Sequence, residues 1–156
     1  MTARHAPAAL ILCCGEYPYL QAIQAFVKRR AGIATYDLLA DAGGAQALLE
    51  GSAAVRRWML QTIRLAHQQD GAKIAILAHH QDCIVYGGSA AFINPAAERA
   101  FHAQQLAKAR MLLRASFPRL TVRMFYAHRT RKRIAFAEIV GGRPRARAAR
   151  RVCTRG

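Results

Sequence analysis

The chain has 156 residues, of which 53% are hydrophobic and 21% are charged. This length suits a single domain, and the composition supports a buried core and excludes a chain that is disordered throughout. The 24 Lys and Arg residues against 8 Asp and Glu give a formal net charge of +16, which raises nucleic acid as a possible partner. We expect no membrane span, because no apolar run approaches the roughly 20 residues that a spanning helix needs.

Apolar patterning predicts strands and helices in alternation. A continuous apolar run such as residues 8–14 is typical of a buried parallel strand, whereas the three- and four-residue spacing in residues 19–30 is typical of a helix. In chain order we expect a strand at 8–14, a helix at 19–30, a strand at 33–40, a helix at 53–69, a strand at 73–78, a helix at 95–116, and strands at 120–126 and 134–140. This order predicts an α/β fold, a single domain with a mainly parallel sheet and helices on both faces.

The C-terminal segment differs in composition from the rest. Residues 143–156 contain six arginines and little that a core could bury. We therefore expect a folded domain over residues 1–142 and a disordered basic tail over residues 143–156. Such a tail would add a weak, salt-sensitive attraction to nucleic acid. Nearly all the cations are Arg in an Ala-rich chain, a pattern that coding bias produces as readily as a binding face.

Metal-binding residue types stand at the ends of two expected strands. Cys14 ends the first strand, and His80-Gln81-Asp82-Cys83 follows the third. The carboxyl ends of parallel strands form the ligand-binding edge of such a sheet, and two Cys with one His make a zinc set with a fourth position open. Successive strand residues face opposite sides, so only one of Cys13 and Cys14 should face an ion. The alternative is that these cysteines bind no metal and are buried only as small hydrophobic residues.

The motifs, in this order, resemble those of the β-class carbonic anhydrases. That family has strands ending in Cys-x-Asp-x-Arg, in an Ala-Gly turn and in His-x-x-Cys. The corresponding segments here are Cys14-Gly15-Glu16-Tyr17-Pro18, Asp41-Ala42-Gly43-Gly44 and His80-Gln81-Asp82-Cys83. The resemblance covers about residues 8–140 and implies a β-carbonic-anhydrase-like fold and a homodimer. It also implies a zinc-dependent lyase that hydrates carbon dioxide reversibly to bicarbonate, with Cys14, His80 and Cys83 as the metal ligands.

Two departures from that family concern the fourth zinc position. The chain has Glu16 where the family has Asp, and Pro18 where the family has the Arg that holds this carboxylate off the metal. Glu16 could still act catalytically by accepting a hydrogen bond from zinc-bound water, with Arg56, Arg57 or Arg129 replacing the lost cation. It could instead bind zinc directly and close the site. Direct contact is favoured, because an unpaired carboxylate gains most by touching a nearby divalent cation.

Three functions therefore stay open. The first is the zinc lyase, for which His79 and His102 are candidate proton carriers, although each is as readily a structural histidine. The second is a catalytically weak or inactive zinc protein with a structural or regulatory role. The third is a nucleic-acid-binding module that uses the tail and the basic turn at 129–133. The four cysteines would allow disulfides, but nothing else in the sequence suggests secretion, and in an intracellular chain such cysteines are more often metal-binding, catalytic or buried. We therefore expect a cytoplasmic protein by default.

Overall fold

The structure of the chain is a computed structural model, and it describes residues 6–141 and 143–144. Six strands form one sheet in the order β2-β1-β3-β4-β5-β6. The elements, in chain order, are β1 (Ala9–Cys13), α1 (Tyr19–Arg29), β2 (Tyr36–Ala40), α2 (Gln46–Glu50), α3 (Ala53–Arg64), a π-helical segment (Leu65–Gln69), β3 (Ile74–His80), two 3-10 turns (Ile84–Tyr86 and Ser89–Ala91), α4 (Pro95–Ser116), β4 (Thr121–Arg129), β5 (Ile134–Val140) and β6 (Arg143–Pro144).

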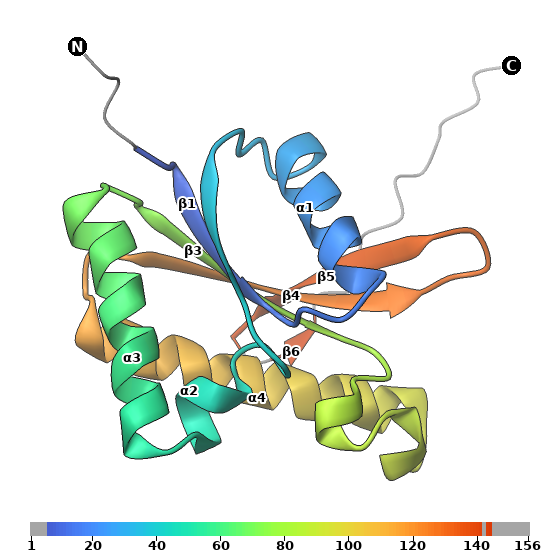
Figure 1. Cartoon of the computed structure of the whole chain (residues 1–156). Helices are drawn as coiled ribbons and strands as arrows, with labels where there is room; N and C mark the ends of the chain where they lie inside the picture. Colours follow the sequence, from blue (N-terminus) through green and yellow to red (C-terminus); the bar gives the residue numbers. More distant parts are fainter. Residues whose placement is uncertain (1–5, 142, 145–156) are drawn as a thin grey trace, which may run out of the picture.

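The sheet is parallel through its first four strands. β1 pairs with β2 and β3, and β3 pairs with β4, all in parallel, whereas β5 and β6 join the edge in antiparallel fashion. Helix α1 covers one face of the sheet, and α2, α3 and α4 lie on the other (Figure 1). The predicted α/β fold, a single domain with a mainly parallel sheet and helices on both faces, is confirmed.

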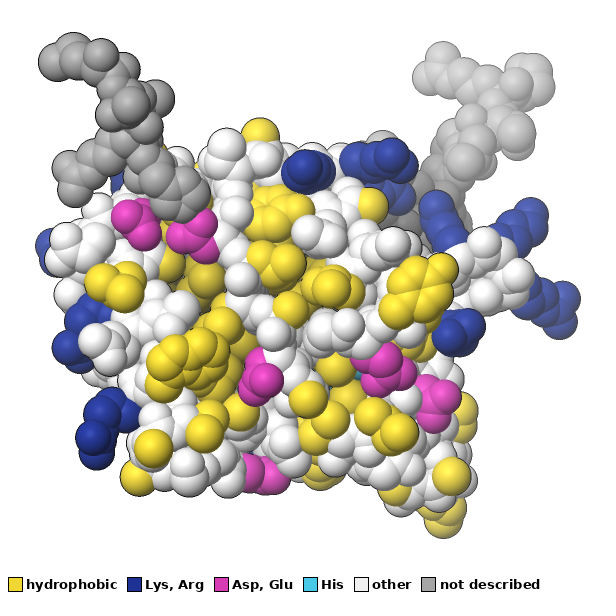
Figure 2. Space-filling model, in the orientation of Figure 1, with side chains coloured by type: hydrophobic (Ala, Val, Ile, Leu, Met, Phe, Trp, Pro, Cys, Tyr) yellow, Lys and Arg dark blue, Asp and Glu magenta, His cyan; other side chains and the backbone are white. Residues whose placement is uncertain are grey.

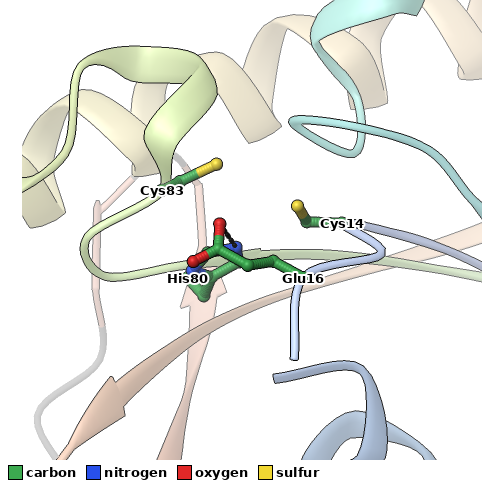
Figure 3. Close-up of side chains that lie close together, drawn as sticks. All are labelled: Cys14, Glu16, His80 and Cys83. Atoms are coloured by element: carbon green, nitrogen blue, oxygen red, sulfur yellow. Dashed lines mark ion pairs between the residues drawn. The ribbon is translucent and has the colours of Figure 1, made fainter. Parts of the chain in front are cut away.

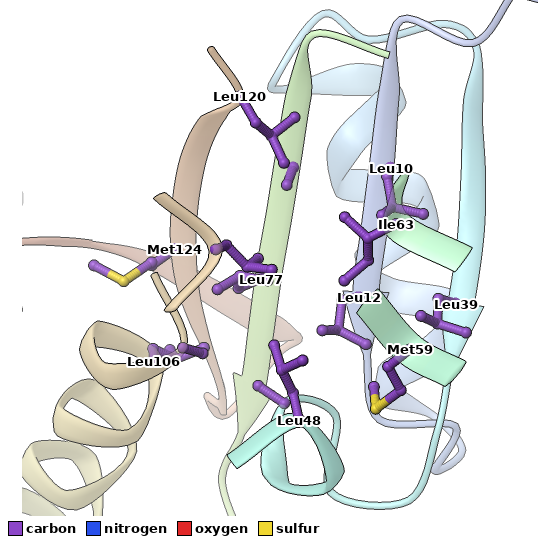
Figure 4. Packing of buried hydrophobic residues seen from close by; sticks show 14 of the residues in the cluster. Leu10, Leu12, Leu39, Leu48, Met59, Ile63, Leu77, Leu106, Leu120 and Met124 are labelled. Carbon is purple, nitrogen blue, oxygen red and sulfur yellow. The ribbon is translucent and has the colours of Figure 1, made fainter. Parts of the chain in front are cut away.

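Both faces of the central strands are buried, which explains their continuous apolar runs. Leu10, Leu12 and Leu77 face α3 and α4, where they pack with residues such as Met59 and Leu106 (Figure 4). The alternate strand residues face α1 and form a second cluster on that side. Full burial of each such side chain stabilises the fold by about 1.5–3 kcal/mol. The strand ends that carry the candidate ligands are therefore held by a packed core.

Several boundaries differ from those expected. β3 continues through His80, where residues 79–80 pair with residues 126–127 of β4, and β4 itself runs on to Arg129. Helix α2 was not predicted. Arg143–Pro144 pair with β5, so the sheet extends two residues beyond the expected domain end at 142. The rest of the expected tail, residues 145–156, lies outside the described residues.

No helix in the described part of the chain combines the length and apolar character needed to cross a membrane. The long helix α4 begins at Pro95, as predicted for the helix over residues 95–116, and Asn94 is its N-cap. The Asn94 side chain accepts a hydrogen bond from the Ala97 N–H at 2.8 Å. This cap fixes the start of a helix whose first turn faces the candidate site, as described below.

Candidate metal centre

Four side chains with metal-binding atoms converge at the carboxyl ends of β1 and β3. Cys14 and Glu16 lie in the loop that follows β1, His80 is the last residue of β3, and Cys83 precedes the first 3-10 turn. One ligand atom of each lies within 4.8 Å of the others, and the side chains point toward a common centre (Figure 3). The structure thus brings together the three residues predicted as ligands and the predicted catalytic carboxylate.

His80 is oriented by a backbone contact. Its Nδ1 lies 2.8 Å from the Gln81 carbonyl oxygen, which can only accept, so Nδ1 carries a hydrogen. Its Nε2 is buried, has no hydrogen-bond partner, and lies 3.6 Å from Glu16 Oε2. The Tyr19 ring stacks on the imidazole with centroids 4.0 Å apart. Nε2 is therefore the nitrogen available to a metal, in the arrangement common for metal-binding histidines.

The two thiols of the cluster are coupled to each other. A hydrogen bond from Cys83 lowers the pKa of Cys14 to about 3 against the opposing effect of burial, with contributions from His80 and from the backbone at Glu16 and Gly43. The same hydrogen bond, together with burial, raises the pKa of Cys83. Cys14 is therefore a thiolate, the form in which cysteine binds metals.

The imidazole of His80 complements this thiolate. Burial lowers its pKa, but contacts with Cys14, Gln81 and Glu16 outweigh burial, and the net result is a raised pKa. The cluster without metal thus holds a proton on Cys83 that a divalent cation would displace, and the raised pKa of His80 favours protonation of the imidazole as well. Release of ligand protons is a general feature of metal binding at cysteine and histidine.

The residues fit a four-coordinate divalent metal. Two sulfurs, one imidazole nitrogen and one carboxylate oxygen form a donor set that zinc prefers. The buried atoms His80 Nε2 and Glu16 Oε2 both lack hydrogen-bond partners, and such unsatisfied atoms are rare in the interior of proteins. A metal at the centre would satisfy both atoms.

Cys13 faces away from this centre. It belongs to the cluster beneath α1, with Ile23 and Val27. Burial, with a smaller effect of Cys14, raises its pKa to about 12, so it stays a neutral thiol. The alternation of side chains along β1 thus places Cys14, and not Cys13, among the candidate ligands.

The Gly43-Gly44 turn packs directly against the cluster. Gly44 has φ of +60°, and a Cβ there would lie 3.2 Å from the Cys14 backbone nitrogen and 3.3 Å from the Ala78 carbonyl oxygen. Glycine is therefore required both for the backbone conformation and for the close approach. This turn therefore both reverses the chain after β2 and brings its backbone against the backbone of Cys14.

Glu16 has no Arg or Lys partner among the described residues. Its ion-pair partner there is His80, whose Nε2 lies 3.6 Å from Glu16 Oε2. Of the cations considered as substitutes, Arg56 donates hydrogen bonds to two carbonyl oxygens of α2. The Arg129 guanidinium carbon lies 5.7 Å from the centroid of the Tyr19 ring, which in turn stacks on His80. Arg129 therefore lies beside the site without pairing with the carboxylate.

The two candidate proton carriers are internal groups. His79 and His102 are only 3% and 0% exposed, and burial is the main cause that lowers the pKa of each, that of His102 to about 4. Both are therefore neutral at pH 7 and poorly placed to exchange protons with solvent. The structure favours the alternative in which these histidines hold the fold around the site.

The sequence of this chain was compared with models of protein families and with curated proteins. Residues 5–136 match a family model described as "Putative carbonic anhydrase". A search of curated proteins gives no significant match.

Solved structures of carbonic anhydrases also match the chain. The enzyme from Streptococcus mutans is 15% identical with a TM-score of 0.56, and the match covers 90% of this chain and 87% of that chain. The enzyme from Glaciozyma antarctica is 13% identical with a TM-score of 0.48, covering 89% and 82% of the two chains. The first of these likenesses shows a shared fold.

Proposed function

The chain belongs to the carbonic anhydrase family whose model matches residues 5–136, and we propose that it is a zinc-dependent lyase of the β class that hydrates carbon dioxide reversibly to bicarbonate. The observation that carries this proposal is the convergence of Cys14, His80, Cys83 and Glu16 within 4.8 Å. Zinc held there would supply hydroxide at neutral pH, because the ion lowers the pKa of bound water towards 7.

The chain's own residues prepare this site. The Gln81 carbonyl and the Tyr19 ring hold the His80 imidazole with Nε2 directed at the metal position. Backbone N–H groups and the Cys83 thiol stabilise the Cys14 thiolate before any metal arrives. Such preorganisation by surrounding contacts strengthens metal binding and fixes the orientation of the ligands.

A narrow recess with partly apolar walls lies beside the ligands. It has room for about one water-sized molecule, and its walls include the ligands Cys14 and His80 together with the apolar side chains of Ile23 and Phe136. Tyr19 also lines it, and its hydroxyl is buried without a hydrogen-bond partner. Burial raises the pKa of Tyr19, so the hydroxyl stays protonated and can donate to an oxygen of bicarbonate. These features support carbon dioxide and bicarbonate as the substrate pair.

Glu16 is the fourth ligand in this proposal and closes the resting site. The carboxylate reaches the ligand group, and no Lys or Arg nitrogen of the described residues lies within 4.0 Å of it. Turnover then requires Glu16 to withdraw, and activity at neutral pH is low. The same observation favours a second candidate function, a zinc protein with a permanently closed site and a structural or regulatory role.

Stopped-flow measurement of carbon dioxide hydration by the zinc-loaded protein tests the proposed activity. The control is Cys83→Ala, which removes one proposed ligand, and Glu16→Ala opens the fourth position. We expect hydration above the control rate for the wild type and faster hydration for Glu16→Ala. If neither protein exceeds Cys83→Ala at pH 7 or pH 9, the catalytic proposal fails and the structural role is favoured.

We also propose a homodimer, on the family resemblance, and a cytoplasmic location, because Cys13, Cys14 and Cys83 are free thiols. On the face shown in Figure 2, apolar side chains occupy much of the middle, while Lys and Arg lie near the outline. Exposed large apolar residues on the edge strand β2 and on α3 include Leu38, Val55 and Trp58. An edge strand flanked by exposed apolar side chains is suited to pairing with a second copy of the chain. The apolar character of this face makes it less suited to binding nucleic acid.

A further inference from the structure

The turn between the candidate ligands His80 and Cys83 has an unusual backbone. Asp82 has φ of +61°, the left-handed conformation that residues other than glycine seldom adopt. After the turn, the Cys83 carbonyl oxygen accepts hydrogen bonds from Tyr86 and Gly88, at 3.1 and 2.9 Å. Because only two residues separate His80 from Cys83, the conformation of Asp82 determines where the Cys83 sulfur points.

A buried carboxylate from α4 holds this turn. Glu98 is only 1% exposed, and its Oε1 accepts the Asp82 N–H at 2.6 Å. Its Oε2 accepts the Ser89 hydroxyl at 2.8 Å, and the Ser89 N–H in turn donates to Asp82 Oδ1 at 2.8 Å. The three residues therefore form a closed ring of hydrogen bonds around the turn.

This ring is not needed to begin α4. Asn94 already caps the helix through its side chain, and Glu98 directs both carboxylate oxygens at residues 82 and 89 outside the helix. A carboxylate in the first turn is favoured by the helix dipole, and charge-assisted hydrogen bonds are the strong ones. Glu98 therefore ties the ligand turn to a 22-residue helix packed on the core.

We propose that Glu98 is a positioning residue of the metal centre, which holds Asp82 in its left-handed conformation and so aims the Cys83 sulfur at Cys14 and His80. The inference rests on the proposed function, because it takes these residues as the metal ligands. Residues that orient metal ligands typically change metal affinity by about 10–100-fold when they are removed.

Zinc affinity, measured by competition with a chelator, is the first test. We expect binding about 10–100-fold weaker for Glu98→Ala and a smaller loss for Glu98→Gln, which keeps an acceptor for the Asp82 N–H. Ser89→Ala removes one bond of the ring and should also weaken binding. Glu138→Ala is the matched control, because it removes a carboxylate paired with Arg123 on the sheet, and it should not change affinity.

A second readout needs no metal. Phenylarsine oxide bridges two neighbouring thiols, so its rate of bridging Cys14 and Cys83, followed by mass spectrometry, reports how the sulfurs are placed in the metal-free protein. We expect slower bridging in Glu98→Ala and Ser89→Ala than in the wild type and Glu138→Ala. This readout separates a displaced Cys83 from a general loss of stability, since the control bears the same kind of substitution.

The outcomes are decisive in each case. Unchanged zinc affinity and unchanged bridging in both Glu98→Ala and Ser89→Ala would overturn the inference. If Glu98→Ala does not fold, Glu98→Gln and Ser89→Ala decide by the same two readouts. If the wild type binds no zinc, the proposed function fails, and the bridging rates alone decide whether Glu98 positions Cys83.

Discussion

The Nδ1 atoms of His79 and His102 lie 3.2 Å apart in the core, so one imidazole must donate a hydrogen to the other. The Ala45 N–H donates to His79 Nε2 at 3.3 Å, which leaves the hydrogen of neutral His79 on Nδ1. His79 is thus the donor, and neutral His102 carries its own hydrogen on Nε2, which is buried without a partner. The pair links β3 to α4 and anchors the chain just after the Gly43-Gly44 turn.

The burial of His102 predicts a loss of stability in acid. Burial, with a smaller effect of His80, lowers the pKa of His102 to about 4, against about 6.5 in the unfolded chain. Between pH 4 and pH 6.5 the unfolded chain therefore binds more protons than the folded chain. The contribution of His102 is therefore fully present above about pH 6.5 and is lost as pH falls toward 4, by roughly 3 kcal/mol.

Urea unfolding at pH 7, 6 and 5 checks this prediction. The free energy of unfolding should fall less steeply with acid in His102→Gln than in the wild type, because the variant lacks one titrating group. Release of any bound metal in acid would affect both proteins alike, so the difference in slope isolates His102. Identical slopes would mean that His102 does not titrate as described.

Substitution of Glu16 should increase activity. If Glu16 occupies the fourth metal position, Glu16→Ala and Glu16→Gln free it, and we expect carbon dioxide hydration at pH 7 to rise by about tenfold, or ~1.4 kcal/mol in the barrier. If Glu16 instead accepts a hydrogen bond during catalysis, both variants should be slower than the wild type. Stopped-flow assays distinguish the two roles by the sign of the change, with Glu138→Ala as the control.

The Tyr19 ring should matter more to zinc binding than its hydroxyl. Stacking on His80 at a centroid distance of 4.0 Å orients the imidazole. Because aromatic pairs contribute about 0.5–1.5 kcal/mol, Tyr19→Leu should weaken zinc binding by roughly 2–12-fold. Tyr19→Phe keeps the ring and should bind zinc like the wild type, as chelator competition would show. A large loss in Tyr19→Phe would assign the metal-binding role to the hydroxyl.

The proposed homodimer gives a test in solution. Sedimentation equilibrium at micromolar concentration should give twice the chain mass, and a charge at the edge strand, as in Leu38→Lys, should weaken association. Leu38 is 39% exposed, so the folded monomer tolerates the change. A wild-type protein that sediments as a monomer would contradict the proposal.

The fold could be predicted where local patterns are strong. The buried runs of β1 and β3 and the capped start of α4 follow from sequence alone, because each depends on neighbouring residues. Helix α2 could not, since Gln46–Glu50 is short and its N-cap position, Ala45, offers no side-chain hydrogen bond. β3 was expected to end before its histidines, because histidine is normally polar. The strand continues because His79 is buried through hydrogen bonds with Ala45 and His102, which sequence does not reveal.

The candidate metal centre also has a part that sequence predicts and a part that only the structure reveals. A zinc set of two Cys and one His could be proposed from spacing and from its place at strand ends, and the resemblance to the β-class carbonic anhydrases selected Cys14 over Cys13. Glu98 and Ser89 could not be proposed, because they act through the backbone of Asp82 and belong to no motif of their own. The sequence does show that Glu98 is an acidic residue in the first turn of a helix. The helix dipole alone explains such a residue, so its position does not indicate a role at the metal centre.

The zinc content of the purified protein tests the central claim most directly. Elemental analysis of the wild type, Cys83→Ala and Cys13→Ala separates the proposed ligand from the neighbouring thiol beneath α1. We predict one zinc per chain in the wild type and in Cys13→Ala, and loss of zinc in Cys83→Ala. A wild-type protein without zinc, or a Cys83→Ala protein that keeps its full zinc content, would contradict this account of the metal centre.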